Sequence, residues 1–283
     1  MLAGIAMFSV NDALGKWLLV DYSVGELLLI RSAVALILLA PIVGKTGVAV
    51  FATAPQPMLQ VARVVLSALE VAMFFWAVSY LPLADAVTFY LAGPIYVTAL
   101  SVVLLGETVG WRRWSAVVAG FVGVVLALRP SAASFTLPAL IALCGSIFFA
   151  VLMVTTRMLR ETSDTVLVCG PIGATLVLGA MVAPFGWVTP TLRDFLLLSL
   201  FGVLSVAALA CVNRSLKLAP ASVVVPYQYT MIIWAITLGY AVFGDIPDLL
   251  TSAGAAIIIA SGLYIFWREQ KQGSQRVPSR QIP

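Results

Sequence analysis

Long apolar runs separated by short polar segments dominate the sequence. A helix needs about 20 apolar residues to cross a bilayer, and windows bounded by charge, Pro and Gly give runs of that length. We predict ten membrane spans, at residues 2–20, 24–43, 58–80, 84–105, 111–128, 136–156, 164–184, 192–212, 221–243 and 249–267. Only 44–57 and 184–191 are expected to form real loops, and the polar, basic tail 268–283 is expected to be disordered.

The composition places the chain in a membrane. Hydrophobic residues make up 62% of the 283 residues and charged residues 10%, whereas soluble domains are about half apolar and about a quarter charged. Backbone polar groups in lipid must be satisfied internally, so the expected fold class is an all-α integral membrane bundle. The lipid bilayer is its expected partner. The net charge of +4 then reflects membrane orientation, and no nucleic acid is expected.

Two long segments of the chain repeat one another. The matches are Ala84 with Ala221 at a shift of 137 residues, Gly106-Glu107 with Gly244-Asp245 at 138, and Gly123 with Gly262 at 139. Because these glycines and acids are not apolar filler, we divide the chain into a first repeat, 1–129, and a second, 130–267. Each repeat has five spans, an odd number, so the two halves are expected to be inverted relative to each other.

The basic residues indicate how the chain is oriented. In the ten-span scheme, the side that holds the tail takes twelve of the sixteen: Lys45, Arg63, Arg112, Arg113, Arg157, Arg160, Arg214, Lys217, Arg268, Lys271, Arg276 and Arg280. Lys and Arg concentrate in cytoplasmic loops, so both termini are expected in the cytoplasm. The first apolar run begins at Leu2 without a basic segment before it, and is expected to be a retained span rather than a signal peptide.

Charged and amide side chains inside the spans are the first functional candidates, because charge at bilayer depth is costly unless it faces a partner or water. They are Asn11, Asp12, Arg31, Glu70, Asp85 and Gln228. A structural ion pair between Glu70 and Arg31 is the competing interpretation, and Asp85 is expected to be structural. Lys16 lies one helical turn beyond Asp12 and can simply neutralise it.

Aromatic residues and prolines form a second group of candidates. The aromatic candidates for a cavity are Trp76, Tyr80, Tyr90, Tyr96, Phe148, Tyr227 and Tyr229. Tyr80 also suits the aromatic belt at a membrane surface, whereas deeper Tyr hydroxyls need partners and favour a polar cavity. Pro94, Pro171 and Pro226 each free a backbone carbonyl within a span, and are interpreted either as bends that form a cavity or as plain packing.

The turn at Gly106-Glu107 has a structural interpretation. Glycine suits the left-handed residue that ends a helix, and Glu107 and its counterpart Asp245 are expected to cap the next helix. Asp245 and Asp248 could together hold a divalent ion, but a cap is the expected role.

Several chemistries are not expected from this composition. The chain has no histidine, and its three cysteines, Cys144, Cys169 and Cys211, lie in apolar runs without metal-ligand spacing. We therefore expect no metal and no cofactor. An ATP-binding loop of the GxxxxGKS type is absent from the sequence, and an intramembrane enzyme would need a base, nucleophile or metal set.

The spans and motifs together resemble the drug/metabolite transporter superfamily, and within it the EamA-type exporters. Besides the five-plus-five spans, the resemblance rests on Leu-Pro-Leu-Ala-Asp-Ala at 81–86 and on Leu105-Gly106-Glu107, and it covers essentially the whole chain. The chain is most similar to the YddG-type exporters of aromatic amino acids, although Gly244-Asp245 stands where the family has Gly-Glu. The resemblance implies secondary transport in the bacterial inner membrane by alternating access around a central cavity.

These features predict an exporter of small metabolites, preferably amino acids with aromatic or other apolar side chains. Rings would hold the side chain, Asp12 and Glu70 the ammonium, and Arg31 or Lys16 the carboxylate. The alternative is a quaternary-ammonium or drug exporter driven by proton antiport, with Glu70 and Trp76 as its cage. An assembly partner without substrate would not concentrate polar residues on inner helices. Proton coupling and the choice between monomer and homodimer stay open.

Overall fold

A computed structural model describes residues 1–47, 49–81, 83–107, 109–128 and 136–244, together with Ala253, Gly254, Ala256, Ile257, Ala260, Ser261 and Tyr264. The helices of the first half are α1 (Leu2–Leu18), α2 (Val24–Thr46), α3 (Ala49–Ala52), α4 (Pro57–Tyr80), α5 (Leu83–Leu91), α6 (Gly93–Leu105) and α7 (Trp111–Leu128). Those of the second half are α8 (Leu137–Met158), α9 (Asp164–Val182), η2 (Ala183–Phe185), α10 (Leu192–Leu218), α11 (Ala221–Val224), η3 (Val225–Thr230), α12 (Met231–Leu238) and η4 (Gly239–Phe243). Most of the predicted span 249–267, the tail 268–283, Asp245 and Asp248 lie outside the described residues.

Five helices of the described residues are long and apolar enough to cross a membrane. They are α2, α4, α8, α9 with η2, and α10. The predicted span 84–105 is divided into α5 and α6, and 221–243 is divided into α11, η3, α12 and η4. Pro94 and Pro226 lie at these interruptions, because proline lacks the N–H that a continuous helix needs. The described part therefore contains fewer uninterrupted spans than the ten that the sequence predicts.

Local sequence explains several helix ends. The hydroxyl of Ser23 accepts the N–H of Glu26 at the start of α2, and Thr191 caps α10 in the same way through Asp194. Gly106 ends α6 in the left-handed conformation, with φ of 64°, as predicted, and Gly244 ends η4 in the same conformation, with φ of 73°. The Glu107 carboxylate accepts the N–H of Ala221 at 3.0 Å, which places this side chain at the first residue of α11.

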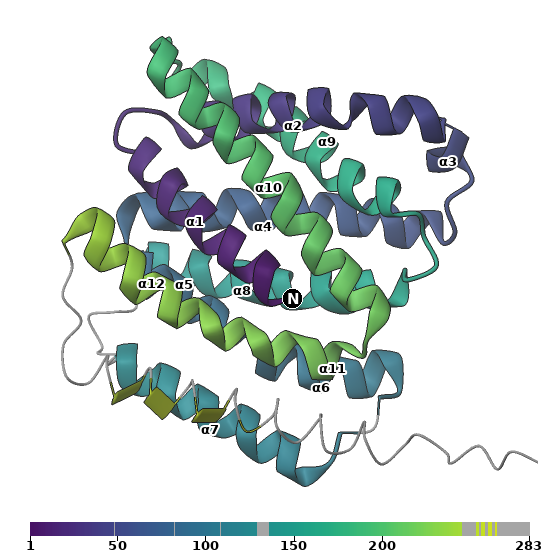
Figure 1. Ribbon diagram of the computed structural model, residues 1–283, viewed down its shortest axis with the longest axis vertical. Helices are drawn as coiled ribbons and strands as arrows, with labels where there is room; N and C mark the ends of the chain where they lie inside the picture. The colour runs from purple at the N-terminus through teal and green to yellow at the C-terminus, as the bar shows by residue number, and fades with distance from the viewer. Residues whose placement is uncertain are drawn as a thin grey trace, which may run out of the picture.

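The helices pack in pairs that cross between the two halves of the chain (Figure 1). Helix α1 packs against α10, and α4 packs against α8; α10 also contacts α2, and α4 contacts α9. Helices α2 and α9 form the remaining large contact, while α7 lies at the edge of the bundle against α5 and α6. The packing partners are thus exchanged between the matched segments 57–80 and 192–218.

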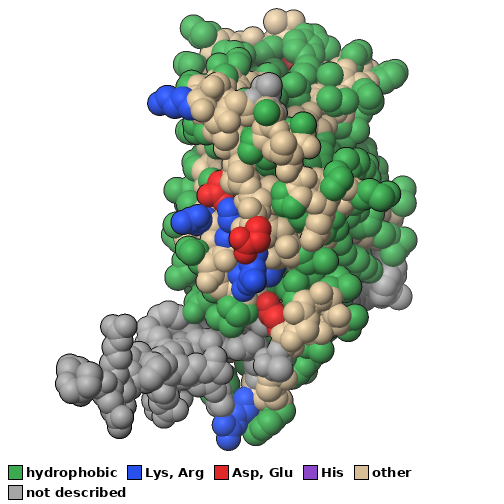
Figure 2. All heavy atoms as spheres, turned by 90° about the vertical axis from the view of Figure 1, so that its right-hand side faces the viewer, with side chains coloured by type: hydrophobic (Ala, Val, Ile, Leu, Met, Phe, Trp, Pro, Cys, Tyr) green, Lys and Arg blue, Asp and Glu red, His purple; other side chains and the backbone are tan. Residues whose placement is uncertain are grey.

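Glycines allow the tightest of these crossings. A Cβ atom on Gly202 of α10 would lie 2.6 Å from the carbonyl oxygen of Arg31 in α2. A Cβ atom on Gly179 of α9 would lie 2.6 Å from the backbone nitrogen of Leu29. Small residues let helix backbones approach closely where no hydrophobic drive holds helices together in lipid. The outer surface is largely hydrophobic, as expected of side chains that face lipid (Figure 2).

Candidate substrate cavity

One cavity of about 120 Å³ lies between the crossing helices. Helices α1, α2, α4, α5, α8, α9 and α10 and the segment η3–α12 all contribute to its wall. Its wall carries four charged side chains: Asp12, Arg31, Arg63 and Glu70. These side chains are 2–8% exposed, so each has been removed from bulk solvent and must find its partners inside the bundle.

Arg31 marks one end of the cavity. Its guanidinium carbon lies 5.1 Å from the ring centre of Phe201 and 5.7 Å from that of Phe75. These two rings contact each other edge to face, and Asn11 donates to the carbonyl of Phe201 at 2.8 Å. We call Arg31, Phe75 and Phe201 the Arg31 end. The arginine is held here by ring faces rather than by an acid.

Asp12 and Glu70 lie near the Arg31 end without closing an ion pair. Both acids interact electrostatically with Arg31 and with each other. Within the described residues, however, no ion pair joins Arg31 to either acid, so the structural pair considered for Glu70 and Arg31 is not formed. The hydroxyl of Tyr90 donates to the carbonyl of Glu70 at 3.5 Å and also interacts with its carboxyl group. Both acids therefore face the cavity with capacity for a further donor.

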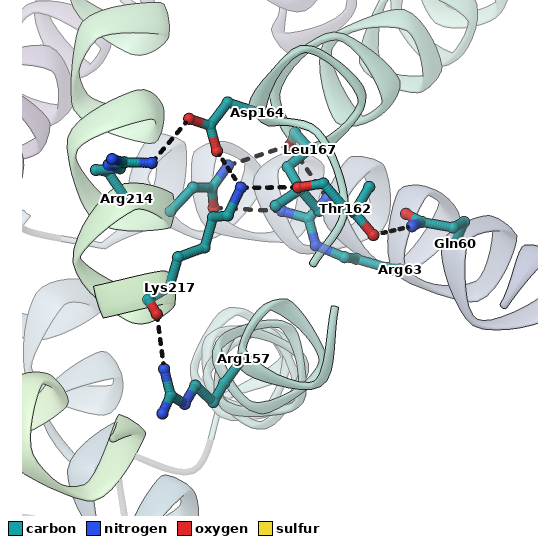
Figure 3. A network of polar contacts seen from close by, with 9 residues as sticks. Gln60, Arg63, Arg157, Thr162, Asp164, Leu167, Arg214 and Lys217 are labelled. Atoms are coloured by element: carbon teal, nitrogen blue, oxygen red, sulfur yellow. Dashed lines mark hydrogen bonds and ion pairs between the residues drawn. The ribbon is translucent and has the colours of Figure 1, made fainter. Parts of the chain in front are cut away.

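Arg63 marks the opposite end, and Figure 3 shows it beside Leu167 of α9. It donates to the hydroxyl of Thr156 at 2.9 Å, to the carbonyl of Leu167 at 3.1 Å and to the side-chain oxygen of Asn213 at 3.3 Å. We call these four groups the Arg63 end. The sequence assigned Arg63 to the charges flanking a membrane span. At 2% exposure it is instead buried in the bundle.

A second set of polar contacts, from the same helices, forms an exposed charged cluster. Gln60 donates to Thr162, and Lys217 donates to the carbonyl of Thr162 and to the carboxylate of Asp164 (Figure 3). Asp164 also pairs with Arg214 at 3.5 Å. Figure 2 shows acidic and basic side chains gathered at the middle of one face, with hydrophobic side chains around them.

Two of the prolines act through the carbonyls that they free. Pro171 supplies no N–H for the carbonyl of Leu167, four residues earlier, and Arg63 and Asn213 donate to that oxygen instead, both at 3.1 Å. Pro94 likewise supplies no N–H for the carbonyl of Tyr90, and the side-chain amide of Gln228 donates to that oxygen at 3.3 Å. Each freed carbonyl thus recruits a polar side chain of a distant segment to the cavity wall.

The other candidates are distributed between the cavity and the surrounding packing. Asn11, Asp12, Arg31, Glu70, Tyr90, Pro171 and Gln228 line the cavity. Trp76 contacts Tyr80, which is 65% exposed, so neither ring is part of the wall. Tyr229 is fully buried, with its hydroxyl on the carbonyl of Val117 in α7. The remaining candidates outside the wall are Pro94, Tyr96, Phe148, Pro226 and Tyr227.

Several wall residues were missed by reasoning from the sequence. They are Arg63, Phe74, Phe75, Phe149, Thr156 and Asn213. Phe74 contacts Tyr90 edge to face, and Tyr90 contacts Phe149, so these rings form a continuous aromatic wall. A signal was present in the spacing: Arg63, Ser67, Glu70, Val71 and Phe74 recur at the interval of one helix face. The part of the chain that the structure describes contains no group of three or more Cys, Asp or Glu placed to bind a metal.

Comparison with known proteins identifies transporters along the whole chain. The S-adenosylmethionine uptake transporter of Rickettsia bellii is 27% identical over 278 residues, which is 98% of this chain and 95% of that protein. The riboflavin transporter of Vibrio cholerae is 26% identical and covers 97% of this chain and 94% of that protein. The pseudopaline exporter CntI of Pseudomonas aeruginosa is 29% identical, with 90% of each chain covered. None of these three is named as an enzyme or for an aromatic amino acid.

The fold and the family agree with these relatives. A solved crystal structure superposes with a TM-score of 0.70 at 18% identity, covering 95% of this chain and 98% of the other, a likeness of fold alone. The model of the EamA-like transporter family matches twice, at residues 1–129 and 136–267. The chain belongs to the EamA-like transporter family.

Proposed function

We propose that this chain is a secondary transporter of zwitterionic metabolites that contain an α-amino acid group and an apolar or aromatic part. The observation that carries the proposal is that two acids and two arginines line one cavity without pairing with each other. A zwitterion offers an ammonium to the acids and a carboxylate to an arginine, and Phe74, Tyr90 and Phe149 offer ring faces to its apolar part.

Alternating access between two inverted five-helix repeats is the mechanism that we propose. Two observations support this arrangement: the family model matches the chain twice, and the packing partners are exchanged between the matched segments. Inverted repeats give a carrier two related states around one midplane cavity. The resemblance favours export from a bacterial cell, and the distribution of Lys and Arg favours cytoplasmic termini. The named relatives include both uptake transporters and an exporter.

Transport into liposomes that carry the purified protein tests this proposal. Labelled tryptophan, methionine and the cation tetraphenylphosphonium would be compared with and without an imposed pH gradient. We expect flux of the amino acids. Flux of tetraphenylphosphonium alone, and only with the gradient, would replace the proposal by a drug exporter driven by protons, which the acids and aromatic wall would also suit.

The acids provide the first variant test. Glu70→Gln and Asp12→Asn are each expected to lower amino-acid flux at least tenfold, because a neutral amide gives up the charge that binds the ammonium, worth about 1.4 kcal/mol or more. Glu161→Gln is the matched control, since Glu161 is an exposed acid that pairs with Arg160 outside the cavity. Full transport by both cavity variants at normal expression would show that these acids are structural.

A further inference from the structure

Arg63 is a buried cation without an acidic partner. It is 2% exposed and lines the cavity. In the described ranges the ion pairs are Arg160 with Glu161, Arg214 with Asp164 and Lys217 with Asp164, and none of them includes Arg63. Burying a charge without a counter-charge is costly, so a side chain of this kind is kept where a ligand can supply the charge.

The hydrogen bonds of Arg63 leave part of its guanidinium available. Nε donates to Thr156, Nη1 to the carbonyl of Leu167, and Nη2 to Asn213, all of them neutral acceptors. An arginine has five N–H donors, so one remains on each terminal nitrogen. Two N–H groups on adjacent nitrogens match the two oxygens of a carboxylate. The three contacts that are already made hold the guanidinium in place and leave these two N–H groups unused.

The other basic side chains near the cavity are engaged differently. Arg31 lies over two phenyl rings and in the field of Asp12 and Glu70, which partly neutralise it. Lys16 donates to the carbonyl of Leu81 at 2.8 Å and is not part of the cavity wall. The sequence assigned carboxylate binding to one of these two residues, and the geometry favours neither.

We infer that Arg63 is the residue that binds the carboxylate of the transported zwitterion. This inference rests on the proposed function and makes its substrate class specific: a free carboxylate is required. Arg63 and Glu70 lie on one face of α4, seven residues or about 10 Å apart along the helix axis. Both side chains line the same cavity, so a zwitterion within it has a cation at Arg63 for its carboxylate and an acid on the same helix face for its ammonium.

Calorimetric binding to the purified protein tests this assignment with a pair of ligands that differ only in the carboxylate. Tryptophan and tryptophanamide share the ring and the ammonium. The wild-type protein is expected to bind tryptophan at least tenfold more tightly than the amide. Arg63→Gln should remove this preference while it retains binding of the amide. Arg63→Lys should keep part of the preference for tryptophan, because lysine keeps the positive charge but lacks the paired N–H groups of a guanidinium.

Two matched variants and a stability measurement separate binding from folding. Arg157→Gln is one control, because Arg157 donates to two backbone carbonyls at the same end of the bundle but lies outside the cavity wall. It should keep the tenfold preference. Arg31→Gln should weaken both ligands alike. All variants are compared by thermal unfolding, and Arg63→Lys serves if Arg63→Gln does not fold.

The outcomes that overturn the inference are specific. A preference for tryptophan that survives in both Arg63 variants, or that is lost in Arg31→Gln instead, would place the carboxylate elsewhere and leave the proposed function standing. Failure of the wild-type protein to bind tryptophan, methionine and their amides would overturn the proposed function as well.

Discussion

At one end of the cavity Arg31 lies over the rings of Phe75 and Phe201, and at the other end Arg63 donates to Thr156, Asn213 and a backbone carbonyl. These ends occupy matched positions. The shift of 138 residues relates Phe75 to Asn213 and Arg63 to Phe201, and the serines that precede α2 and α9 relate Arg31 to Pro171.

At these three matched positions the Arg31 end has Arg31, Phe201 and Phe75. The Arg63 end has Pro171, Arg63 and Asn213 in their places. The matched segments pack in corresponding ways, but the side chains at their matched positions differ in chemical type. Both arginines belong to the first half of the chain, one to α2 and the other to α4, and the matched positions of the second half hold Pro171 and Phe201. The difference suggests that a zwitterion is oriented in the cavity, with its carboxylate at the Arg63 end.

The largest expected effect concerns the helix crossings beside the two arginines. Gly202→Ala would bring a methyl group to 2.6 Å from the carbonyl oxygen of Arg31, and a backbone cannot give way easily. We expect a loss of about 2 kcal/mol in the free energy of unfolding. Gly170→Ala at the Arg63 end meets only a side-chain methyl group of Val64, at 2.9 Å, and gains helix propensity of about 1 kcal/mol. Its stability should change little.

Thermal unfolding of the two glycine variants in detergent would measure this contrast. Equal destabilisation of both would mean that the two crossings are equally tight, contrary to the geometry described here.

A second comparison removes the amide that supports each end. Asn213→Ala deletes a buried acceptor of Arg63 and a donor to the carbonyl of Leu167, and should cost about 2 kcal/mol. Asn11→Ala deletes one bond, to the carbonyl of Phe201, and should cost about 1 kcal/mol. Thermal unfolding measures both, and a larger loss for Asn11→Ala would contradict the ranking.

The aromatic wall between the ends should govern selectivity. Phe149→Ala is expected to lower tryptophan flux about tenfold relative to methionine, because it removes a ring that contacts Tyr90. Phe148→Ala and Trp76→Ala are matched controls with rings outside the wall, and should leave the ratio of the two fluxes unchanged. The liposome assay gives this ratio directly. The same change in all three variants would point to folding rather than recognition.

The smallest effect is expected at the charged surface beyond the Arg63 end. Asp164→Asn breaks its ion pairs with Arg214 and Lys217, but the Asp164 side chain is 53% exposed. We expect a loss of about 0.5 kcal/mol at low salt that disappears in high salt, because exposed pairs are screened. Unfolding at two salt concentrations checks this. A large loss independent of salt would assign Asp164 to the support of Arg63.

The candidate site shows why depth alone is a limited guide to function. Asp12, Arg31, Glu70, Tyr90 and Gln228 were found from the cost of polar groups inside a membrane, and all five line the cavity. Arg63 was missed because it lies only six positions after Pro57, the first residue of α4, and its charge was assigned to the membrane surface. Its place on the face of Glu70 was visible in the spacing.

Depth in the membrane also did not show which of two neighbouring aromatic residues lines the cavity. Phe148 and Phe149 are adjacent and equally apolar, yet only Phe149 shares a helix face with Leu152, Met153 and Thr156 on the cavity wall. In lipid both sides of a helix can be apolar, so the hydrophobic pattern does not reveal which side faces the interior. That choice depends on the neighbouring helices.

Long apolar runs and sparse charge were enough to place this chain in a membrane, because only apolar helices of this length are stable in a bilayer. The sequence also identified Gly106 as the residue that ends α6, since the local backbone conformation decides this position. The tertiary structure alone decided which residues share the cavity. The partners of Arg63 come from α8, α9 and α10, far away in the chain, and Arg31 rests on rings from α4 and α10. Such contacts depend on how helices cross, which no single helix encodes.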